Sequence, residues 1–109
     1  MRILMKEPGK DPRVMIVPNE LGFLQQLVGG FIEVHRLTDG LVMIVDEEGK
    51  LKNKRPNFRV AALDDTIVGN AIFCGEDGED FADIDEHDLT ILQTFFSLGP
   101  DIIGGAANE

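Results

Sequence analysis

Residues 20–46 read ELGFLQQLVGGFIEVHRLTDGLVMIVD, and they hold the elements on which the remaining fold prediction depends. Four apolar residues of the first part recur at helical spacing on one face, namely Leu21, Leu24, Leu27 and Val28. We predict a short helix with Asn19 as its N-cap, because a side-chain oxygen there can accept from the free amides of the first turn. The pair Gly29-Gly30 follows, where a left-handed C-cap needs a residue without a Cβ.

Two strands are predicted after this helix. Phe31–Leu37 and Leu41–Val45 are rich in β-branched and large apolar residues, and the residues between them suit a hairpin turn. The second of these strands is apolar at every position, which is typical of a strand covered on both faces and therefore central in its sheet.

The segments on both sides of this region add further elements. Before the helix, Arg2–Met5 and Arg13–Val17 predict a hairpin around a turn rich in Pro and Gly. After the second hairpin, we predict a loop over residues 50–62 with one helical turn near Phe58–Leu63. A strand over Thr66–Cys74, bent at Gly69-Asn70, is expected next, followed by an acidic loop over residues 76–83. The last predicted element is a helix over Glu86–Leu98, capped by Asp85 and stopped by Gly99-Pro100.

These elements predict one α+β domain over residues 1–98, followed by a flexible C-terminal tail over residues 99–109. A chain of 109 residues has room for one hydrophobic core. The expected architecture is a small, mostly antiparallel sheet of four to five strands with two helices, in the order ββαβββα.

Charge is distributed unevenly along the chain. All ten Lys and Arg lie in residues 1–59 together with eight acids, whereas residues 60–109 hold twelve acids and no Lys or Arg. The two halves therefore carry +2 and −12, within a net charge of −10. This asymmetry predicts an oriented electrostatic field and poor affinity of the C-terminal half for nucleic acid or anionic lipid. Solubility is the simplest explanation of the acidic excess.

Composition excludes several classes of protein. The 43% apolar and 28% charged content is that of an ordinary globular protein. No apolar run reaches the ~18 residues of a membrane span, and the first ten residues lack the apolar core of a signal peptide. The single cysteine, Cys74, cannot form an internal disulfide, so we expect a protein of the reducing cytoplasm. Because no apolar run is long enough to span a membrane, we also expect no membrane binding.

The order of several short motifs resembles a family of small acidic proteins from phages, plasmids and conjugative elements, known as a domain of unknown function. The resemblance covers residues 1–98 and is carried by Glu7-Pro8-Gly9-Lys10, Val28-Gly29-Gly30, Ile32-Glu33-Val34, Glu47-Glu48-Gly49-Lys50-Leu51, Pro56-Asn57, the run Ile67–Phe73 and Asp80-Phe81. One departure is Asn70-Ala71, where the family more often resembles Gly-Thr. The resemblance implies an α+β domain and a mobile-element context, with no catalytic residue to carry over.

Recognisable catalytic and phosphate-loop patterns are absent from the sequence. This absence and the charge asymmetry lead us to expect a non-enzymatic protein, without cofactor or metal, that binds another protein through its acidic C-terminal half. The resemblance implies that it is an accessory protein of a phage or mobile element and that its partner is a host or mobile-element protein. The residues expected at this contact are Glu76, Asp77, Glu79, Asp80, Asp83 and Glu86.

Residues 76–88 carry eight carboxylates in thirteen positions and allow two further interpretations. The first interpretation is a mimic of DNA with an anti-defence role. The negative charge of the C-terminal half as a whole is too dilute for this role, at roughly 250 Å² of surface per charge against about 100 Å² for B-DNA. Only the local run approaches the charge density of DNA. The second interpretation is a calcium-binding loop. The run lacks the EF-hand pattern, so at most a loose site for a divalent cation remains.

Three more alternatives stay open. A ligand-binding or enzymatic domain would use His35 or Cys74 in a pocket. Five cations in residues 50–59 could hold phosphates, although the net charge opposes nucleic-acid binding. The apolar stripe of the last helix, with Leu92, Phe95 and Phe96, could bury itself in the core or form a homodimer.

Overall fold

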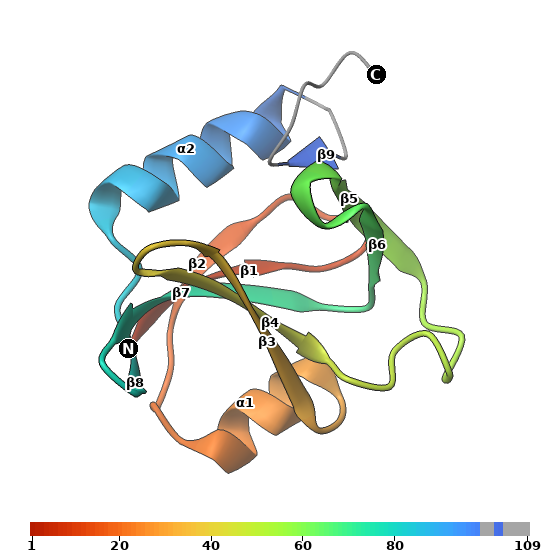
Figure 1. Ribbon diagram of the computed structural model, residues 1–109, viewed down its shortest axis with the longest axis horizontal. Helices are drawn as coiled ribbons and strands as arrows, with labels where there is room; N and C mark the ends of the chain where they lie inside the picture. The colour runs from red at the N-terminus through yellow and green to blue at the C-terminus, as the bar shows by residue number, and fades with distance from the viewer. Residues whose placement is uncertain (99–101, 104–109) are drawn as a thin grey trace.

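The strands of the protein form two sheets, and one helix lies on each side of the larger sheet (Figure 1). The computed structural model of the protein describes residues 1–98 and 102–103. The elements are β1 (Arg2–Lys6), β2 (Arg13–Ile16), α1 (Leu21–Val28), β3 (Ile32–Thr38), β4 (Leu41–Asp46), β5 (Pro56–Val60), the 3₁₀ turn η1 (Ala61–Leu63), β6 (Asp65–Val68), β7 (Ala71–Asp77), β8 (Asp80–Ala82), α2 (Glu86–Ser97) and β9 (Ile102–Ile103).

The larger sheet has the strand order β2-β1-β7-β4-β3, and β8 pairs with the end of β7. Every pair in it is antiparallel, and the two predicted hairpins, β1–β2 and β3–β4, are both present. All residues of β4 are buried, and the strand lies between β7 and β3. This confirms the prediction that Leu41–Val45 is covered on both faces.

Buried side chains form one cluster on each face of the larger sheet. Because successive strand residues point to opposite faces, the neighbours Val42 and Met43 belong to different clusters. The cluster of Val42 packs under α1 through Leu24 and Val28. The cluster of Met43 packs under α2 and the smaller sheet, and its centre contains three aromatic rings with centroids 5.3–6.1 Å apart, those of Phe58, Phe73 and Phe96.

The segment between β4 and β7 differs from the prediction. The expected loop and helical turn over Phe58–Leu63 are wrong in their first part, because β5 occupies Pro56–Val60 and only Ala61–Leu63 form a turn of 3₁₀ helix. The expected single strand over Thr66–Cys74 is two strands, β6 and β7, which separate at Gly69 with φ +74°.

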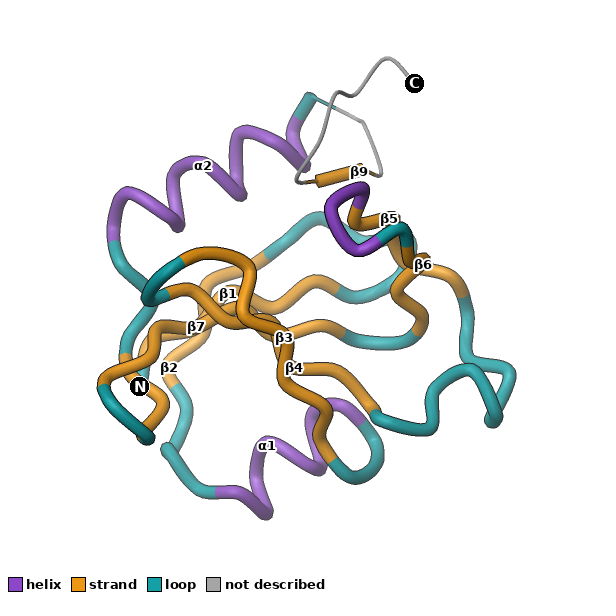
Figure 2. The backbone as a smooth tube through the Cα atoms, viewed as in Figure 1, coloured by secondary structure: helices purple, strands orange, loops and turns teal. Residues whose placement is uncertain are grey.

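The physical reason lies in the smaller sheet. β5 pairs antiparallel with β6 and parallel with β9 (Figure 2). Phe58, Val60 and Ile67 are buried beneath α2 in the same cluster as Phe73. Burial beneath α2, which is distant in sequence, therefore favours the strand conformation of β5 and β6. The local pattern of apolar residues does not predict these strands.

The expected acidic loop over residues 76–83 is instead a hairpin. β7 continues to Asp77, the chain turns at Gly78 with φ +64°, and β8 returns as far as Ala82. β8 pairs with Gly75–Asp77, beyond Phe73, the last residue of β7 that pairs with β1. Acidic residues have a low propensity for strands, but the backbone hydrogen bonds to β7 hold β8 in the strand conformation.

The helix ends agree with the sequence except at one cap. Gly29 has φ +83° and ends α1, and Asp85 caps α2 by accepting from the amide of His87 at 3.1 Å, as predicted. The N-cap of α1 is Glu20, so the prediction of Asn19 is wrong. The side-chain amide of Asn19 donates to the carbonyl of Phe81 at 2.8 Å, which ties it to the hairpin.

The α+β class, with a mainly antiparallel sheet and two helices, is confirmed, and the smaller sheet is an addition to it. In the described part of the chain, the helices are too short or too polar to cross a membrane. The predicted helix stop at Gly99-Pro100 lies outside the described residues. The predicted tail, residues 99–109, lies outside them as well, apart from the backbone of Ile102–Ile103 in β9.

Candidate functional site

The acidic residues predicted as a contact surface lie on the β7–β8 hairpin and on the connection from it into α2. Glu76 and Asp77 end β7, Glu79 lies in the turn and Asp80 begins β8. Asp83 and Glu86 follow, the latter as the first residue of α2. The structure therefore places four of the six on one β-hairpin.

Three of the six carboxylates are used within the protein. Glu76 accepts from both Nε and Nη2 of Arg36 on β3, at 2.8 and 2.7 Å. The backbone amide of Arg2 donates to Asp83 at 2.8 Å, and the guanidinium of Arg2 pairs with Glu86 at 2.9 Å. These contacts hold the hairpin and the start of α2 against the sheet.

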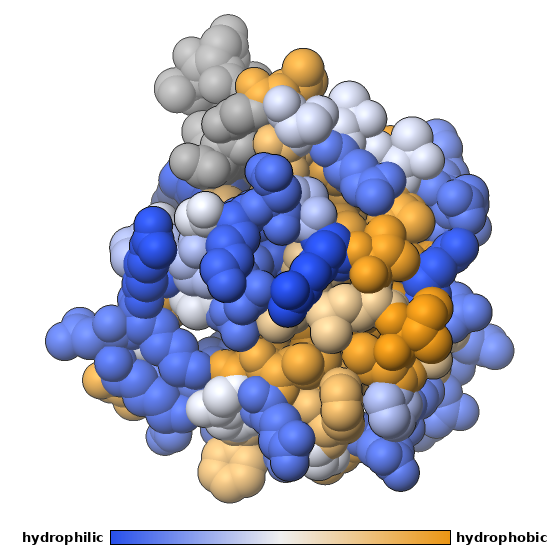
Figure 3. Space-filling model, turned by 180° about the vertical axis from the view of Figure 1, so that it is seen from behind, coloured by the Kyte–Doolittle hydropathy of each residue, from blue (hydrophilic) through white to orange (hydrophobic). Residues whose placement is uncertain are grey.

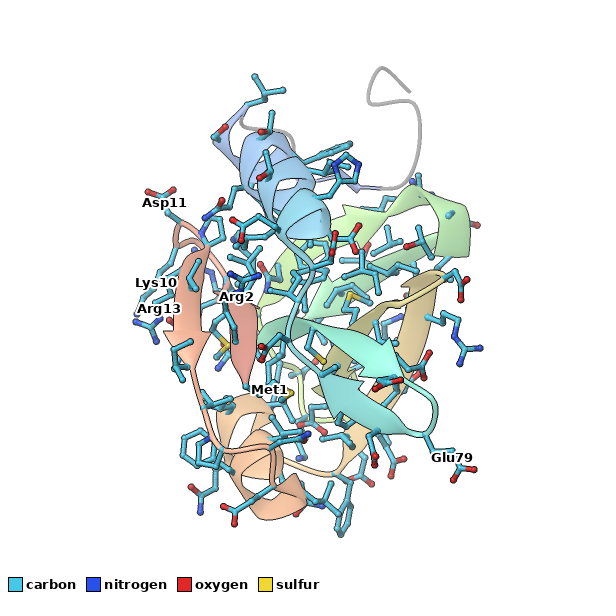
Figure 4. All side chains as sticks on the ribbon, turned by 90° about the vertical axis from the view of Figure 1, so that its left-hand side faces the viewer. Met1, Arg2, Lys10, Asp11, Arg13 and Glu79 are labelled. Atoms are coloured by element: carbon cyan, nitrogen blue, oxygen red, sulfur yellow. The ribbon has the colours of Figure 1, made fainter. Side chains whose placement is uncertain are left out.

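The other three carboxylates, Asp77, Glu79 and Asp80, form what we term the anionic tip. All three side chains are exposed, and they have no ion-pair partner among the described residues. Figure 4 shows Glu79 at the far end of the hairpin, whereas Lys10 and Arg13 lie on the opposite side of the same view. The tip is therefore a small anionic projection, separated from the basic β1–β2 turn.

The basic segment over residues 50–59 is largely neutralised by the protein itself. Four of its five cations contact carboxylates, in the pairs Lys50 with Asp65, Arg59 with Asp64, and Lys52 and Lys54 both with Asp46. The fifth, Arg55, has no carboxylate partner among the described residues. The segment therefore does not present the continuous row of free cations that phosphate backbones require.

Asp46 and its two lysines form a cluster at the C-terminal end of α1, the Asp46 cluster. The ammonium groups of Lys54 and Lys52 lie 2.7 and 2.9 Å from the carboxylate, whose side chain is 1% exposed. They also donate to the carbonyls of Val28 and Gly29, at the negative end of the helix dipole. Burial alone would raise the pKa of Asp46, but the hydrogen bonds from Lys54 and Lys52 outweigh it and lower the pKa to about 2.

Sequence reasoning missed the Asp46 cluster, although two signals pointed to it. A polar residue that ends a fully apolar strand must find partners. The Gly29-Gly30 pair also has a second role, because a Cβ on Gly30 would lie 2.6 Å from Asp46 Oδ1. The identity of the partners depended on the path of the loop after β4, from which Lys52 and Lys54 reach the end of α1.

His35 and Cys74 point to opposite faces of the larger sheet. His35 stands opposite Met43 and Cys74 stands opposite Val42, and these two partners belong to different core clusters. Directly opposed residues share a face, so the two side chains do not form a nucleophile–base pair. His35 borders a cavity of about 160 Å³, smaller than the ~300 Å³ at which ligand pockets usually begin.

We expect Cys74 to be unreactive in the folded protein. Burial, with a smaller contribution from Glu76, raises the pKa of the thiol to about 12, so little thiolate is present at pH 8. Labelling with a chromogenic disulfide reagent should be more than about 100-fold slower in the native protein than in guanidinium chloride. Equal labelling rates in the two conditions would show that the thiol is accessible and would contradict this assignment.

The apolar stripe of α2 is mostly core. Leu92 is 5% and Phe96 is 9% exposed, so these two side chains belong to the core of the chain, and a homodimer through Leu92, Phe95 and Phe96 stays a prediction. Phe95 is half-buried, and Ile91 is exposed beside it. Val14 and Ile16 of the edge strand β2 are exposed as well. Apolar surface is also visible on the rear face of the molecule (Figure 3).

Among the described residues, no group of three or more His, Cys, Asp and Glu side chains is arranged to hold a metal ion. The loose divalent-cation site considered for the acidic run therefore has no ligand cluster in that part of the chain. What the hairpin offers instead is exposed negative charge on a pair of hydrogen-bonded strands, which can attract a cationic surface.

Comparison with known proteins places these features in a family context. A family described as a domain of unknown function (DUF3846) matches residues 1–98. No curated protein and no solved structure matches the chain. The matched range includes every element from β1 to α2.

Proposed function

This chain belongs to the family described as a domain of unknown function, DUF3846, and we propose that it is a non-enzymatic binding protein whose contact surface is the anionic tip. The partner that fits this surface is a protein with a cluster of Lys and Arg side chains. An accessory role in the cytoplasm, for a phage or another mobile element, is part of the proposal, and the sequence resemblance is its support.

The observation that carries the proposal is the separation of the acids into two groups. Glu76 and Glu86 pair with arginines of the protein itself and Asp83 accepts from the backbone amide of Arg2, whereas the three acids of the anionic tip are exposed to solvent. Support by hydrogen-bonded strands lowers the entropy that a partner's contact must overcome. Fixed negative charge also speeds association with a cationic partner.

We restrict the proposed contact surface from the six predicted acids to the three of the anionic tip. This smaller surface weakens the interpretation as a DNA mimic, because three charges on one turn do not reproduce the long double row of a duplex. A partner that normally binds nucleic acid still has the required chemistry, since its Lys and Arg side chains can meet the tip.

The test is a set of pull-downs from a bacterial lysate at low salt, with the immobilised protein and two triple variants. The combination Asp77→Asn, Glu79→Gln and Asp80→Asn removes the charge of the tip. The matched control, Asp39→Asn, Glu47→Gln and Glu48→Gln, removes the same charge from other exposed acids.

We expect a protein that the wild type and the control capture equally, with about tenfold weaker binding to the tip variant, as three partly screened contacts of ~0.5 kcal/mol each would give. Capture should also fall as NaCl is raised. Equal capture by both triple variants would contradict the proposal, and so would the recovery of no partner at low salt.

A further inference from the structure

Arg55 is the exception among the arginines of this protein. The other four each contact a carboxylate, in the pairs Arg2 with Glu86, Arg13 with Glu7, Arg36 with Glu76 and Arg59 with Asp64. The chain holds twenty acids against ten Lys and Arg, so partners are plentiful. Arg55 nevertheless has none among the described residues.

Arg55 lies instead at a pocket of about 350 Å³ between the β1–β2 turn and the start of β5. Its guanidinium packs against the backbone of Gly9, where a Cβ would stand 2.6 Å from Nη2. Gly9 also has φ +73°, a conformation that glycine adopts without strain. The turn glycine therefore gives the guanidinium room to lie beside the backbone.

Two lysines add positive charge to the same pocket. Lys6 is 6% exposed, donates to the carbonyl of Glu7 at 3.0 Å and to Asn57 Oδ1 at 3.1 Å, and stands over the ring of Phe96. Lys10 is exposed at the rim, 3.9 Å from Glu7. One carboxylate, that of Asp11, also borders the pocket and opposes the cations.

We propose that this pocket binds a small phosphate monoester, with the guanidinium of Arg55 as its main ligand. Three cations and one acid border the pocket, and Glu7 offsets part of the charge of Lys10, which leaves a locally positive site on a protein that carries −10 overall. The planar fork of arginine matches two oxygens of a phosphate, and this charge-assisted geometry is among the stronger hydrogen bonds in proteins.

The size of the pocket and its remaining lining limit the ligand. A volume of about 350 Å³ is at the lower end of the range for small-molecule pockets, so a molecule no larger than a nucleoside monophosphate fits. Pro12, Pro56 and Phe96 give apolar contacts beside the cations. This inference is independent of the anionic tip, because the two sites have no residue in common.

The experiment is a titration of ¹⁵N-labelled protein with inorganic phosphate and with adenosine monophosphate, at constant ionic strength set with NaCl. We expect saturable shifts of the amides of Gly9, Lys10 and Asn57, with the monoester binding more tightly than phosphate. The variant Arg55→Gln should weaken binding at least about tenfold, since it removes a charge-assisted hydrogen bond. The variant Asp11→Asn should tighten binding.

The matched control is Lys50→Gln, which removes one positive charge from the same segment but at a lysine paired with Asp65 and outside the pocket. It should leave the affinity unchanged. The thermal transition of each variant shows that it is folded. Equal affinity of Arg55→Gln and the wild type would overturn the proposal, as would equal weakening by Lys50→Gln or shifts that do not saturate.

Discussion

Replacing Asp46 by asparagine is expected to lower the free energy of unfolding at pH 7 by about 2 kcal/mol, as the shift of its pKa implies. The carboxylate is buried and accepts from Lys52 and Lys54, while the same ammonium groups satisfy carbonyls at the end of α1. Asparagine keeps the shape but loses the charge, so both lysines lose their attraction and the helix end loses its support.

The same residue predicts how stability depends on pH. The pKa of Asp46 falls from 3.8 to about 2 on folding, so the unfolded chain binds the proton more readily. The stabilisation is therefore fully present above about pH 4 and is lost as the pH falls toward 2. In urea titrations, the wild type should lose about 2 kcal/mol more than Asp46→Asn across this interval.

The matched control is Asp64→Asn, which removes a carboxylate that also pairs with a cation. The side chain of Asp64 is 89% exposed, and an ion pair of that kind with Arg59 contributes little. This variant should change the free energy of unfolding by less than about 0.5 kcal/mol. Equal losses in the two variants would show that burial of Asp46 is not the source of the effect.

The second large effect is expected from Gly75→Ala, which should lower the free energy of unfolding by about 3 kcal/mol. A Cβ on Gly75 would lie 2.3 Å from the carbonyl oxygen of Asp83 and 3.4 Å from that of Ala82. Both are backbone atoms, so the overlap cannot be relieved by rotating a side chain. The chain after β8 would have to move away from β7, and the start of α2 would move with it.

Gly22→Ala is the control for this substitution and has the opposite expected sign. Gly22 lies within α1, and a Cβ there would meet no described atom within 4 Å. Alanine in a helix is favoured over glycine by about 0.5–1 kcal/mol, so this variant should be more stable than the wild type. Urea unfolding of both variants measures the difference, and a stable Gly75→Ala variant would contradict the packing argument.

Local patterns were sufficient for most of the helices and for the first four strands. Leu24 and Val28 on one face of α1, Gly29 at its end and Asp85 at the start of α2 each act through neighbours a few residues away. The run Leu41–Val45 is apolar throughout, which reports burial on both faces. Such signals can be read from the sequence because each depends on the backbone conformation and hydrogen bonds of residues that are close together in the chain.

The candidate sites were predictable only in part. The sequence located the acids of residues 76–86, but it could not divide them into the anionic tip and the three that pair within the protein. Arg2 and Arg36, which make that division, are more than thirty residues away along the chain from their partners. Arg55 was likewise one of five similar cations until the pairing of the other four singled it out.

The sequence by itself determined the α+β class, the two helices, the early hairpins and the excess of acid in the C-terminal half, because composition and short-range periodicity encode them. Only the tertiary structure decided that Pro56–Val60 is a strand, that Asp46 binds two lysines, and that His35 and Cys74 face apart. Each of these depends on the burial and pairing of residues distant in sequence, and the free energy of such contacts outweighs local preference.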